Sequence, residues 1–287
     1  MSQSHMHEKN ADQIAYWNGQ GGQHWIARQA TQDILLQPIS EVLHRAAGAA
    51  KGERILDVGC GCGGTTFELA RRVGPDGTVT GLDISAPMLD YARAHAPRDL
   101  KVDFVHADAT VYPFQPAAAD MLFSRFGVMF FADPATSFTN MRKAIKPGGR
   151  VVFACWREPR ANGWMMIPLQ AVYQHVPRMP QLGPDDPGPF SFASEERVHR
   201  ILSAAGFSSI EMKPHDLAMD IALGRGLDVA ATAAIAFGPA SRALDGQPDN
   251  VKAAATQSVR DALSKHEKDG KVPLPASIWI VSAKSAK

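Results

Sequence analysis

The sequence predicts an α/β protein with a doubly wound, parallel sheet, and three observations support this prediction. Short apolar runs alternate with helical patterns over about 54–156, which is typical of consecutive βαβ units. The first run, 54–58, leads into a glycine-rich turn that opens a helix. The last apolar run, 276–283, predicts a terminal strand. Ligands of such sheets bind at the carboxyl ends of the strands, so residues at those ends are the first candidates for a functional site.

Composition indicates a globular protein without affinity for polyanions. The chain has 287 residues, of which 45% are hydrophobic, enough for a large buried core. Its 30 basic and 29 acidic side chains leave a net charge of +1, and no basic stripe longer than Arg71-Arg72 occurs. This balance gives no electrostatic basis for binding nucleic acid or an anionic membrane surface. We therefore expect a small-molecule substrate, and the sequence leaves a homo-oligomer open.

Cysteine spacing and hydropathy favour a cytoplasmic protein. Cys60 and Cys62 lie inside the glycine turn and Cys155 lies far from them, which is not a zinc motif, so we expect reduced thiols and no metal site. No run approaches the roughly eighteen apolar residues of a membrane span. The polar start, residues 1–13, has no apolar core and is not expected to be a signal peptide.

Two helical segments are expected before the first strand. Residues 1 to about 10 are expected to lack regular structure, and helical signals begin near Ala11. A second helix is expected over about 30–47, where apolar residues recur at intervals of three and four and Gly48 ends the pattern. We interpret residues 1–50 as an N-terminal helical cap segment that precedes a domain over 51–287.

Five strands with intervening helices are expected to follow in order. Turn and cap signals delimit them, including Ser85 as an N-cap, Pro134 at a helix start, and glycine-proline turns after the first helix and before the fifth strand. The expected strands are 54–58, 78–83, 102–106, 120–124 and 150–156, and the expected helices are about 64–73, 85–95 and 134–145.

The character of the sequence changes after Trp156. Residues 157–193 are rich in proline and show few strand signals, whereas residues 217–270 are rich in alanine and helical. We expect both segments to be insertions that form a cap or lid over the sheet. Helices are expected at about 164–175, 195–205, 227–237 and 249–268, and strands at 207–213 and 276–283.

The glycine turn predicts a nucleotide-like cofactor but does not by itself say which one. Gly59, Gly61 and Gly64 match the dinucleotide fingerprint, whereas Gly59, Gly61 and Gly63 match the pattern of methyltransferases. Glycine is needed there because a Cβ would obstruct the ligand or strain the backbone. Asp83, at the end of the second strand, suits either cofactor, since a carboxylate there can bind both ribose hydroxyls.

Two further acids favour an adenosyl cofactor that carries positive charge. Asp57 directly precedes the glycines, where it would repel a pyrophosphate but suit a cationic amino-acid group, directly or through water. Asp108 ends the third strand and can accept a hydrogen bond from an adenine amino group. Three carboxylates around one ligand fit a sulfonium with an ammonium better than a dianion. We therefore prefer the frame that ends at Gly63 and expect Gly64 to pack the helix against the sheet.

A family resemblance is carried by five segments in order: RILDVGCGCGGTT, VTGLDISAPML, FVHADA, DMLFSRFGVMFF and KPGGRVVFACW. With this order and spacing the chain resembles the class I S-adenosylmethionine-dependent methyltransferases of the small-molecule type, most broadly the ubiquinone/menaquinone methyltransferase-like group. The resemblance covers 51–156 strongly and the terminal strand weakly. It implies a Rossmann-like sheet of seven strands whose last strand, 276–283, lies antiparallel beside the fifth, and it implies S-adenosyl-L-methionine as cofactor.

The resemblance also assigns cofactor roles to matching positions, and it implies a reaction. Methyl transfer from such a cofactor is an in-line displacement, so the protein mainly aligns the nucleophile and excludes water. The expected acceptor is an oxygen, nitrogen or carbon nucleophile of a small, mostly apolar metabolite. The implied contacts are Asp57, Gly59, Cys60, Gly61, Gly63 and Thr65 around the methionyl part, Asp83, Ile84 and Met88 at the ribose and adenine, Asp108 and Ala109 at the adenine edge, and Ser124 near the sulfonium.

Candidates for catalysis and for the acceptor pocket come from the DMLFSRFGVMFF segment and from parts of the chain outside the five segments. Arg125, after the fourth strand, can hold a carboxylate or enolate of the acceptor, with a structural salt bridge as the alternative, and His24 is a candidate general base. Tyr16, Trp17 and Trp25 are expected to close over the cofactor, although ordinary packing explains them equally well. The residues expected in the acceptor pocket are Met129, Phe130, Trp164 and Phe190.

Two other functions stay open on the sequence alone. A nicotinamide-dependent oxidoreductase would use a similar glycine turn, although Asp57, Asp108, the terminal strand and the lack of a Tyr-x-x-x-Lys pair argue against it. A regulatory protein that binds S-adenosylmethionine without turnover would keep the glycines and Asp83. Binding of S-adenosylhomocysteine but not NAD would exclude the oxidoreductase.

Overall fold

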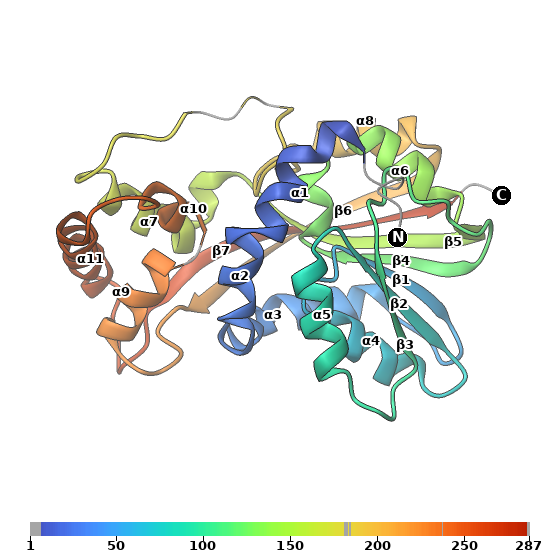
Figure 1. Ribbon diagram of the computed structural model, residues 1–287, viewed down its shortest axis with the longest axis horizontal. Coiled ribbons are helices and arrows are strands. Elements are labelled where there is room, and N and C mark those ends of the chain that lie inside the picture. The colour runs from blue at the N-terminus through green and yellow to red at the C-terminus, as the bar shows by residue number, and fades with distance from the viewer. Residues whose placement is uncertain (1–6, 181–182, 184, 237, 286–287) are drawn as a thin grey trace.

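The computed structural model describes residues 7–180, 183, 185–236 and 238–285, and a seven-stranded sheet with the order β3-β2-β1-β4-β5-β7-β6 forms its centre (Figure 1). The first five strands are parallel, and β7 lies antiparallel between β5 and β6. The predicted Rossmann-like sheet with an antiparallel last strand is therefore confirmed. The strands are β1 (Arg54–Val58), β2 (Thr78–Asp83), β3 (Val102–His106), β4 (Ala119–Arg125), β5 (Ile145–Trp156), β6 (Phe207–Asp220) and β7 (Pro273–Ser285).

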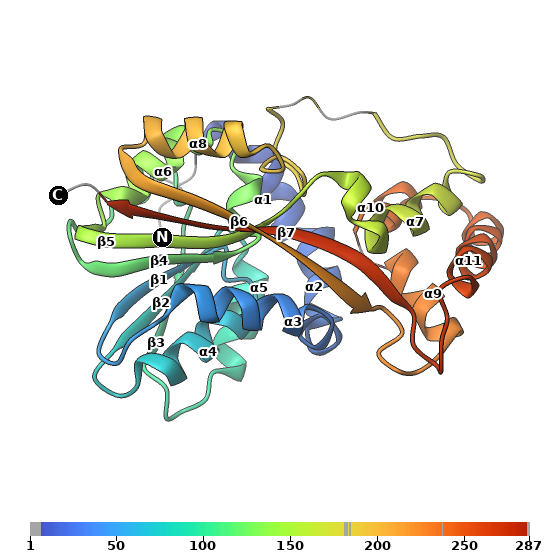
Figure 2. The ribbon, with the colours of Figure 1, turned by 180° about the vertical axis from the view of Figure 1, so that it is seen from behind.

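Helices cover both faces of this sheet, which is why its central strands are apolar runs without alternation. Local signals set the helix starts: the Ser85 hydroxyl caps α5 by accepting from Met88 N, and Asp133 caps α6 in the same way. Gly48 ends α3 in a left-handed conformation, φ +55°. One face carries α3 (Gln29–Ala47), α4 (Gly64–Val73) and α5 (Ala86–His95), and the other carries α6 (Pro134–Arg142) and α8 (Glu195–Ala204) (Figures 1 and 2).

The last two strands are longer than the sequence predicts. β6 and β7 pair from Phe207 with Ser285 to Asp220 with Pro273, beyond the expected ends at 213 and 276. Pro214 lies within β6, which is the edge of the sheet, where a proline needs no ladder hydrogen bond on its free side. The extension carries this edge of the sheet toward the cap helices (Figure 2).

The N-terminal segment is more ordered than expected. Glu8–Asn10 forms a 3₁₀ turn that leads into α1 (Ala11–Asn18) and α2 (Gln20–Ile26), so the expectation of no regular structure is wrong for residues 8–10; residues 1–6 lie outside the described part. Asn10 is 4% exposed because its amide bonds to the sheet end at Asp108. Polar composition suggested a free tail, whereas these polar groups have polar partners within the fold.

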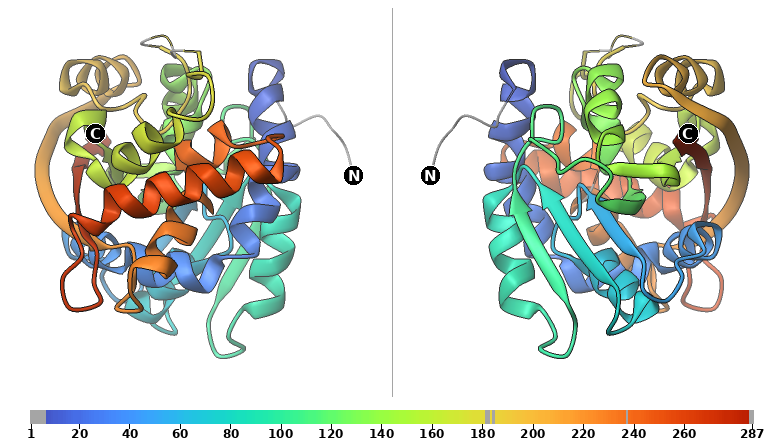
Figure 3. Two further views of the ribbon diagram at one scale, coloured as in Figure 1. Left: turned by 90° about the vertical axis from the view of Figure 1, so that its left-hand side faces the viewer. Right: turned by 90° about the vertical axis from the view of Figure 1, so that its right-hand side faces the viewer.

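Four helices form a cap beyond the carboxyl ends of β4 and β5, and Figure 3 shows α11 lying across this end of the molecule. None of the helices in the described ranges is long and apolar enough to cross a membrane. The expected helix over 227–237 ends at Ala236, since residue 237 is not described, and a further short helix follows it. The cap helices are α7 (Gly163–Val172), α9 (Leu227–Ala236), α10 (Gly238–Ala243) and α11 (Asp249–Ser264).

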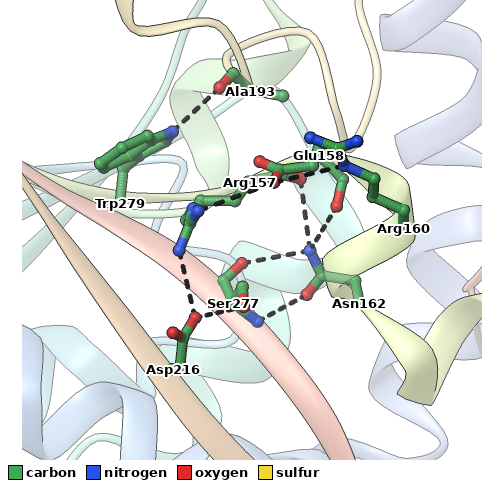
Figure 4. A network of polar contacts seen from close by, with 8 residues as sticks. All are labelled: Arg157, Glu158, Arg160, Asn162, Ala193, Asp216, Ser277 and Trp279. Carbon is green, nitrogen blue, oxygen red and sulfur yellow. Dashed lines mark hydrogen bonds and ion pairs between the residues drawn. The ribbon is translucent and has the colours of Figure 1, made fainter.

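A buried polar network fixes the junction between the sheet and this cap (Figure 4). Asn162, which is fully buried, lies 3.1–3.2 Å from the carbonyl oxygens of Arg157, Glu158 and Ser277 through its Nδ2. Its Oδ1 accepts from Ser277 N at 3.0 Å. Asp216 adds a second link, because its Oδ1 accepts from both Arg157 and the Ser277 hydroxyl. The start of α7 is thereby attached to β7.

Candidate cofactor and acceptor site

A large cavity opens at the carboxyl ends of the central strands, with a volume of about 910 Å³. Its wall combines the strand ends, the N-terminal helices α1 and α2, the α3 helix, and the α7 and α10 helices of the cap. This is where open α/β sheets bind their ligands. The volume is near the upper end of the usual range for ligand sites, so two small molecules can occupy the cavity together.

The glycine turn brings bare backbone to this cavity. Gly59 and Gly61 have φ values of +67° and +55°, which side-chain-bearing residues rarely adopt. A Cβ on Gly59 would lie 2.6 Å from the Cα of Gly127, and one on Gly61 would lie 2.8 Å from the Met88 side chain. The turn can pass this closely only without side chains, as the sequence predicts.

Gly63 and Gly64 both permit close packing at the start of α4, and of the two only Gly64 also lines the cavity. Gly63 lies off the cavity wall, and a Cβ there would be 3.0–3.2 Å from Phe67, Phe104 and Ala92. Gly64, the first residue of α4, is on the wall. A Cβ on Gly64 would lie 2.9 Å from Asp33 Oδ1 on α3, so Gly64 lets α4 approach α3, while Gly63 lets α4 approach β3 and α5. Two glycines in succession gave no sequence signal to tell them apart.

Asp83 lies on the wall at the end of β2, and its carboxylate is bonded to backbone on both sides. Its Oδ2 accepts from Gly61 N at 2.8 Å and its Oδ1 from Ser85 N at 2.9 Å. Burial raises the pKa of this carboxyl, and these two hydrogen bonds counteract part of the effect. Each oxygen keeps a further lone pair, so a pair of ribose hydroxyls can still donate to it.

Asp57 does not reach the cavity wall. It is fully buried behind the turn, where its Oδ2 accepts from the hydroxyls of Thr65 and Thr66, both at 2.7 Å. Its Oδ1 has no hydrogen-bond partner among the described residues. Burial raises the pKa of Asp57 to about 6 despite the two hydroxyl donors. The carboxylate thus braces the start of α4, and this geometry gives no direct contact with a ligand in the cavity.

Asp108 lies on the wall, but the N-terminal segment uses its carboxylate. The Oδ2 atom accepts from Asn10 Nδ2 at 2.6 Å and from His7 N at 3.1 Å, while Oδ1 accepts from Thr110 N at 2.8 Å. Asn10 also accepts from Ala132 N through its Oδ1. An adenine amino group would have to share this carboxylate. Nothing in the sequence around Asn10 indicated the link.

Two other predicted residues are not brought to the cavity. The Ser124 hydroxyl donates to Val58 O at 2.7 Å and accepts from Gly127 N, so this buried side chain joins neighbouring strand ends off the wall. Trp164 also lies off the wall and packs on Trp156 with ring centroids 5.1 Å apart. Position near a strand end or in a cap helix predicted proximity but not the direction of the side chain.

Arg125 lies on the wall at the end of β4 and turns toward α3. Its side chain is 10% exposed, Nη1 donates to the Ser40 hydroxyl at 2.8 Å, and Nη2 lies 3.5 Å from Asp33 Oδ1. Burial lowers the pKa of the guanidinium, and Asp33 and Asp57 partly offset this. Arginine keeps its charge in proteins, so Arg125 is a fixed cation of the wall.

The remaining predicted residues meet on the wall of this one cavity. Trp17 joins the N-terminal group to the acceptor end, with ring centroids 6.3 Å from Trp25 and 5.3 Å from Phe130, both edge-on. The predicted residues on the wall are Gly59, Cys60, Gly61, Thr65, Asp83, Ile84, Met88, Asp108 and Ala109, then Tyr16, Trp17, His24 and Trp25, then Arg125, and at the acceptor end Met129, Phe130 and Phe190.

Sequence reasoning missed two groups of wall residues. Gln29 and Gln32 interrupt the apolar face of α3, and two buried amides on an otherwise apolar helix face are a signal that could have been used. The other group lies in the cap and its loops, where no motif marks it. Its members include Leu169, Tyr173, Arg178, Met179 and Arg242.

Comparison with known proteins identifies the kind of site. Residues 55–149 match the family model described as a methyltransferase domain. The demethylmenaquinone methyltransferases of Staphylococcus aureus strains JH9 and Newman are 30% identical to this chain over 177 residues, covering 58% of this chain and 72% of each relative. These matches give no support to a nicotinamide-dependent oxidoreductase or to a binding protein without turnover.

Solved structures show the same fold. The YcgJ protein of Bacillus subtilis superposes with a TM-score of 0.56 at 14% identity, covering 86% of this chain and 98% of that one. Phosphoethanolamine N-methyltransferase 2 of Haemonchus contortus, solved with S-adenosyl-L-methionine, gives a TM-score of 0.53 at 20% identity, covering 87% of this chain and 53% of that one.

Proposed function

Because this chain belongs to the class I S-adenosylmethionine-dependent methyltransferases, we propose that its methyl acceptor is a small, mostly apolar metabolite with an oxygen, nitrogen or carbon nucleophile. The protein is an enzyme of S-adenosylmethionine-dependent methyl transfer. The observation that carries the proposal is that one cavity of about 910 Å³ joins the glycine turn to an apolar chamber under the cap. The curated relatives are named for demethylmenaquinone, which also supports an apolar acceptor.

The acceptor chamber is defined as the part of the cavity wall formed by Phe130, Trp156, Met165, Met166 and Phe190. Methionine side chains are flexible and polarisable, so such a wall adapts to more than one apolar shape. Aromatic faces favour a planar ring against them. The chamber therefore suits a ring-containing acceptor better than a sugar or a peptide.

The residues present fit an adenosyl cofactor: a carboxylate at the end of β2 faces the cavity, and the glycines leave a cradle that a Cβ would fill. When bound, S-adenosyl-L-methionine supplies a methyl group on positively charged sulfur. Asp83 would hold the ribose hydroxyls, and the backbone of Gly59 and Gly61 would lie along the amino-acid arm. We propose that Trp17 and Trp25 exclude water over the reacting atoms.

His24 is the general base that we propose for acceptors that must lose a proton. It lies on the cavity wall on α2, exposed enough to exchange protons with solvent. A phenol or an enol would need such a group, whereas an amine would not. Replacement of His24 would then affect the first class of acceptor alone.

We also propose a cytoplasmic enzyme that does not act on nucleic acid. The net charge of +1 and the three free, buried cysteines support this location and this partner class. Residues 1–50 and the segments 157–193 and 217–270 would act together as the cap of the methyltransferase domain over 51–287.

Transfer of labelled methyl tests the acceptor class. The protein would be incubated with methyl-labelled S-adenosyl-L-methionine and a panel of apolar phenols, quinols and amines, with an organic extract counted for label. We expect transfer to at least one member, and a fall of about tenfold or more in Met166→Glu, because a carboxylate in the chamber must be desolvated when the acceptor binds.

The matched control is Gln170→Glu, which adds the same charge at an exposed position of the same helix. It should leave transfer unchanged, and both variants should bind S-adenosylhomocysteine like the wild type. Transfer to polar peptides or nucleic acid, with none to the apolar panel, would refute the proposal.

A further inference from the structure

Two arginines on the cavity wall have no acidic partner in the part of the chain that the structure describes. Arg178, in the loop after α7, and Arg242, on α10, both line the cavity and are exposed. Neither guanidinium makes an ion pair or a hydrogen bond to another described residue. The third arginine of this wall, Arg125, is buried and faces Asp33. Arg178 and Arg242 therefore keep their N–H donors for a ligand.

Two cap helices lead from the acceptor chamber to these arginines. Along α7, Tyr173 follows Met165 by two turns on the cavity side, about 12 Å farther along the axis, and Arg178 lies over its ring. On α10, a Cβ on Gly238 would lie 3.9 Å from Met165 Cγ. Arg242 is one turn beyond Gly238, about 6 Å along the axis of α10. Both cations are therefore within reach of one ligand that has its apolar part against Met165.

Each of these guanidinium groups lies against a tyrosine ring of the same wall. The distance from the guanidinium carbon to the ring centroid is 5.8 Å for Arg178 and Tyr173, and 5.6 Å for Arg242 and Tyr16. A ring beside a guanidinium restricts its position without neutralising its charge. The N–H groups of a guanidinium lie in its plane, so contact with a ring face leaves them free to donate to an anion.

The carboxylates of the cap do not neutralise these arginines. Asp186 lines the cavity, but its Oδ2 accepts from a backbone N–H of its own loop at 2.7 Å. Asp245, three residues after Arg242, lies off the wall, and its Oδ1 accepts from an amide of α2 at 2.7 Å. The other two carboxylates of the wall, Asp83 and Asp108, lie at the end of β2 and just after β3. The cap side of the cavity therefore carries two cations against one carboxylate.

We propose that the methyl acceptor is an amphiphilic anion, whose apolar ring fills the acceptor chamber while Arg178 and Arg242 bind an acidic group at its other end. A guanidinium suits a carboxylate, a sulfonate or a phosphate, since its N–H groups match a pair of oxygens. Because both arginines are exposed, the anion keeps part of its hydration when it binds. The inference rests on the proposed apolar acceptor and narrows its class. A neutral acceptor would leave both cations without a partner.

A matched pair of fluorescent probes tests this assignment without turnover. The probes are 6-(p-toluidino)naphthalene-2-sulfonate and N-(4-tolyl)-2-naphthylamine, which lacks only the sulfonate. Fluorescence titration of the protein saturated with S-adenosylhomocysteine gives both affinities. We expect Arg178→Gln and Arg242→Gln each to weaken the sulfonate about three- to fivefold, and the double variant about tenfold or more, since an exposed ion pair contributes modestly. The neutral probe should bind all three variants within about twofold of the wild type.

The control is Arg225→Gln, the same exchange at an exposed arginine off the cavity wall, which should leave both affinities unchanged. The double exchange of Arg178 and Arg242 to lysine keeps the charge and should retain most of the affinity for the sulfonate. Equal loss of both probes in the glutamine variants, no loss of the sulfonate in the double variant, or a similar loss in Arg225→Gln would overturn the assignment. Failure of both probes to bind the wild type, or binding that Met166→Glu leaves unchanged, would instead refute the apolar chamber and the proposed acceptor class.

Discussion

The adenosine end of the cavity is held by hydrogen bonds between side chains and backbone, whereas the acceptor end is held by packing of apolar side chains. At the first end Asp83 bonds Gly61 and Ser85, and Asp108 bonds Asn10. At the second end Trp156, Met165 and Phe190 meet a cap helix and a loop. Hydrogen bonds fix direction and methionine-rich packing does not, so the two ends differ in how strictly they define a ligand.

This difference suits the two ligands of a methyltransferase. The cofactor is the same in every turnover, and its sulfur must be aligned for in-line transfer. The acceptor chamber combines two residues at or just after strand ends, Phe130 and Trp156, with Met165, Met166 and Phe190 from the segments that follow β5. The hydrogen bonds of Asn162 to Ser277 then hold the start of the otherwise adaptable cap in a fixed position relative to the sheet (Figure 4).

The largest effect is expected from breaking the adenosine end at Asp83. Asp83→Ala removes the proposed acceptor for two ribose hydroxyls and leaves Gly61 N and Ser85 N without their partner. We expect affinity for S-adenosylhomocysteine to fall about 1,000-fold, since each lost charged hydrogen bond contributes about 1.5–3 kcal/mol. Titration calorimetry measures it, with Asp76→Ala, an exposed acid in the turn before β2, as control. A loss below about tenfold would contradict the ribose role.

The next largest effect is expected at Asn162, in the junction between the sheet and the cap. Asn162→Ala leaves the buried Ser277 N and its carbonyl without their side-chain partner, so we expect the free energy of unfolding to fall by about 3 kcal/mol. Denaturant unfolding measures it, with Asn250→Ala on exposed α11 as control. At temperatures where the variant stays folded, acceptor turnover should fall more than cofactor affinity. Equal losses of acceptor turnover and of cofactor affinity would show that the junction does not act mainly on the acceptor end.

The sequence predicted the adenosine end better than the acceptor end for a physical reason. The parallel strands and Gly59, Gly61 and Asp83 follow local rules: apolar runs, positive φ, and a carboxylate after a strand. Ser124 and Trp164 lie off the cavity wall although their neighbours Arg125 and Met165 line it, because the direction of each side chain depends on tertiary packing. Asn10 was missed because its partner, Asp108, is 98 residues away along the chain.

The smallest effect is expected at His44, where α3 packs against β4. His44, on α3, is 3% exposed and stacks on Phe123 of β4 with centroids 5.2 Å apart. Neither ring nitrogen has a hydrogen-bond partner in the described ranges, and burial, with Arg72 and Arg125 nearby, lowers the pKa of His44 to about 4. The folded protein therefore resists a proton that the unfolded chain accepts below about pH 6.5.

The sign of the pH dependence follows from that lowered pKa. The contribution of His44 to stability is fully present above the unfolded pKa and is lost as pH falls through 6.5 toward 4, by about 2 kcal/mol between pH 7.5 and pH 5. His44→Phe keeps a ring against Phe123 and removes the titration. In denaturant unfolding, we expect the free energy of unfolding of the variant to rise by about 2 kcal/mol relative to that of the wild type as pH falls from 7.5 to 5.

The affinity of the variant for S-adenosylhomocysteine at pH 7.5 should stay within about twofold of the wild-type value, because the packing of α3 on β4 is kept. His199→Gln, on the surface of α8, should leave the wild-type pH dependence intact. If wild type and His44→Phe lose stability in parallel below pH 6.5, other groups cause the acid sensitivity. If the variant instead binds the cofactor poorly, the His44 imidazole helps to position Arg125. The residues that support the adenosine end of the cavity then include His44 on α3.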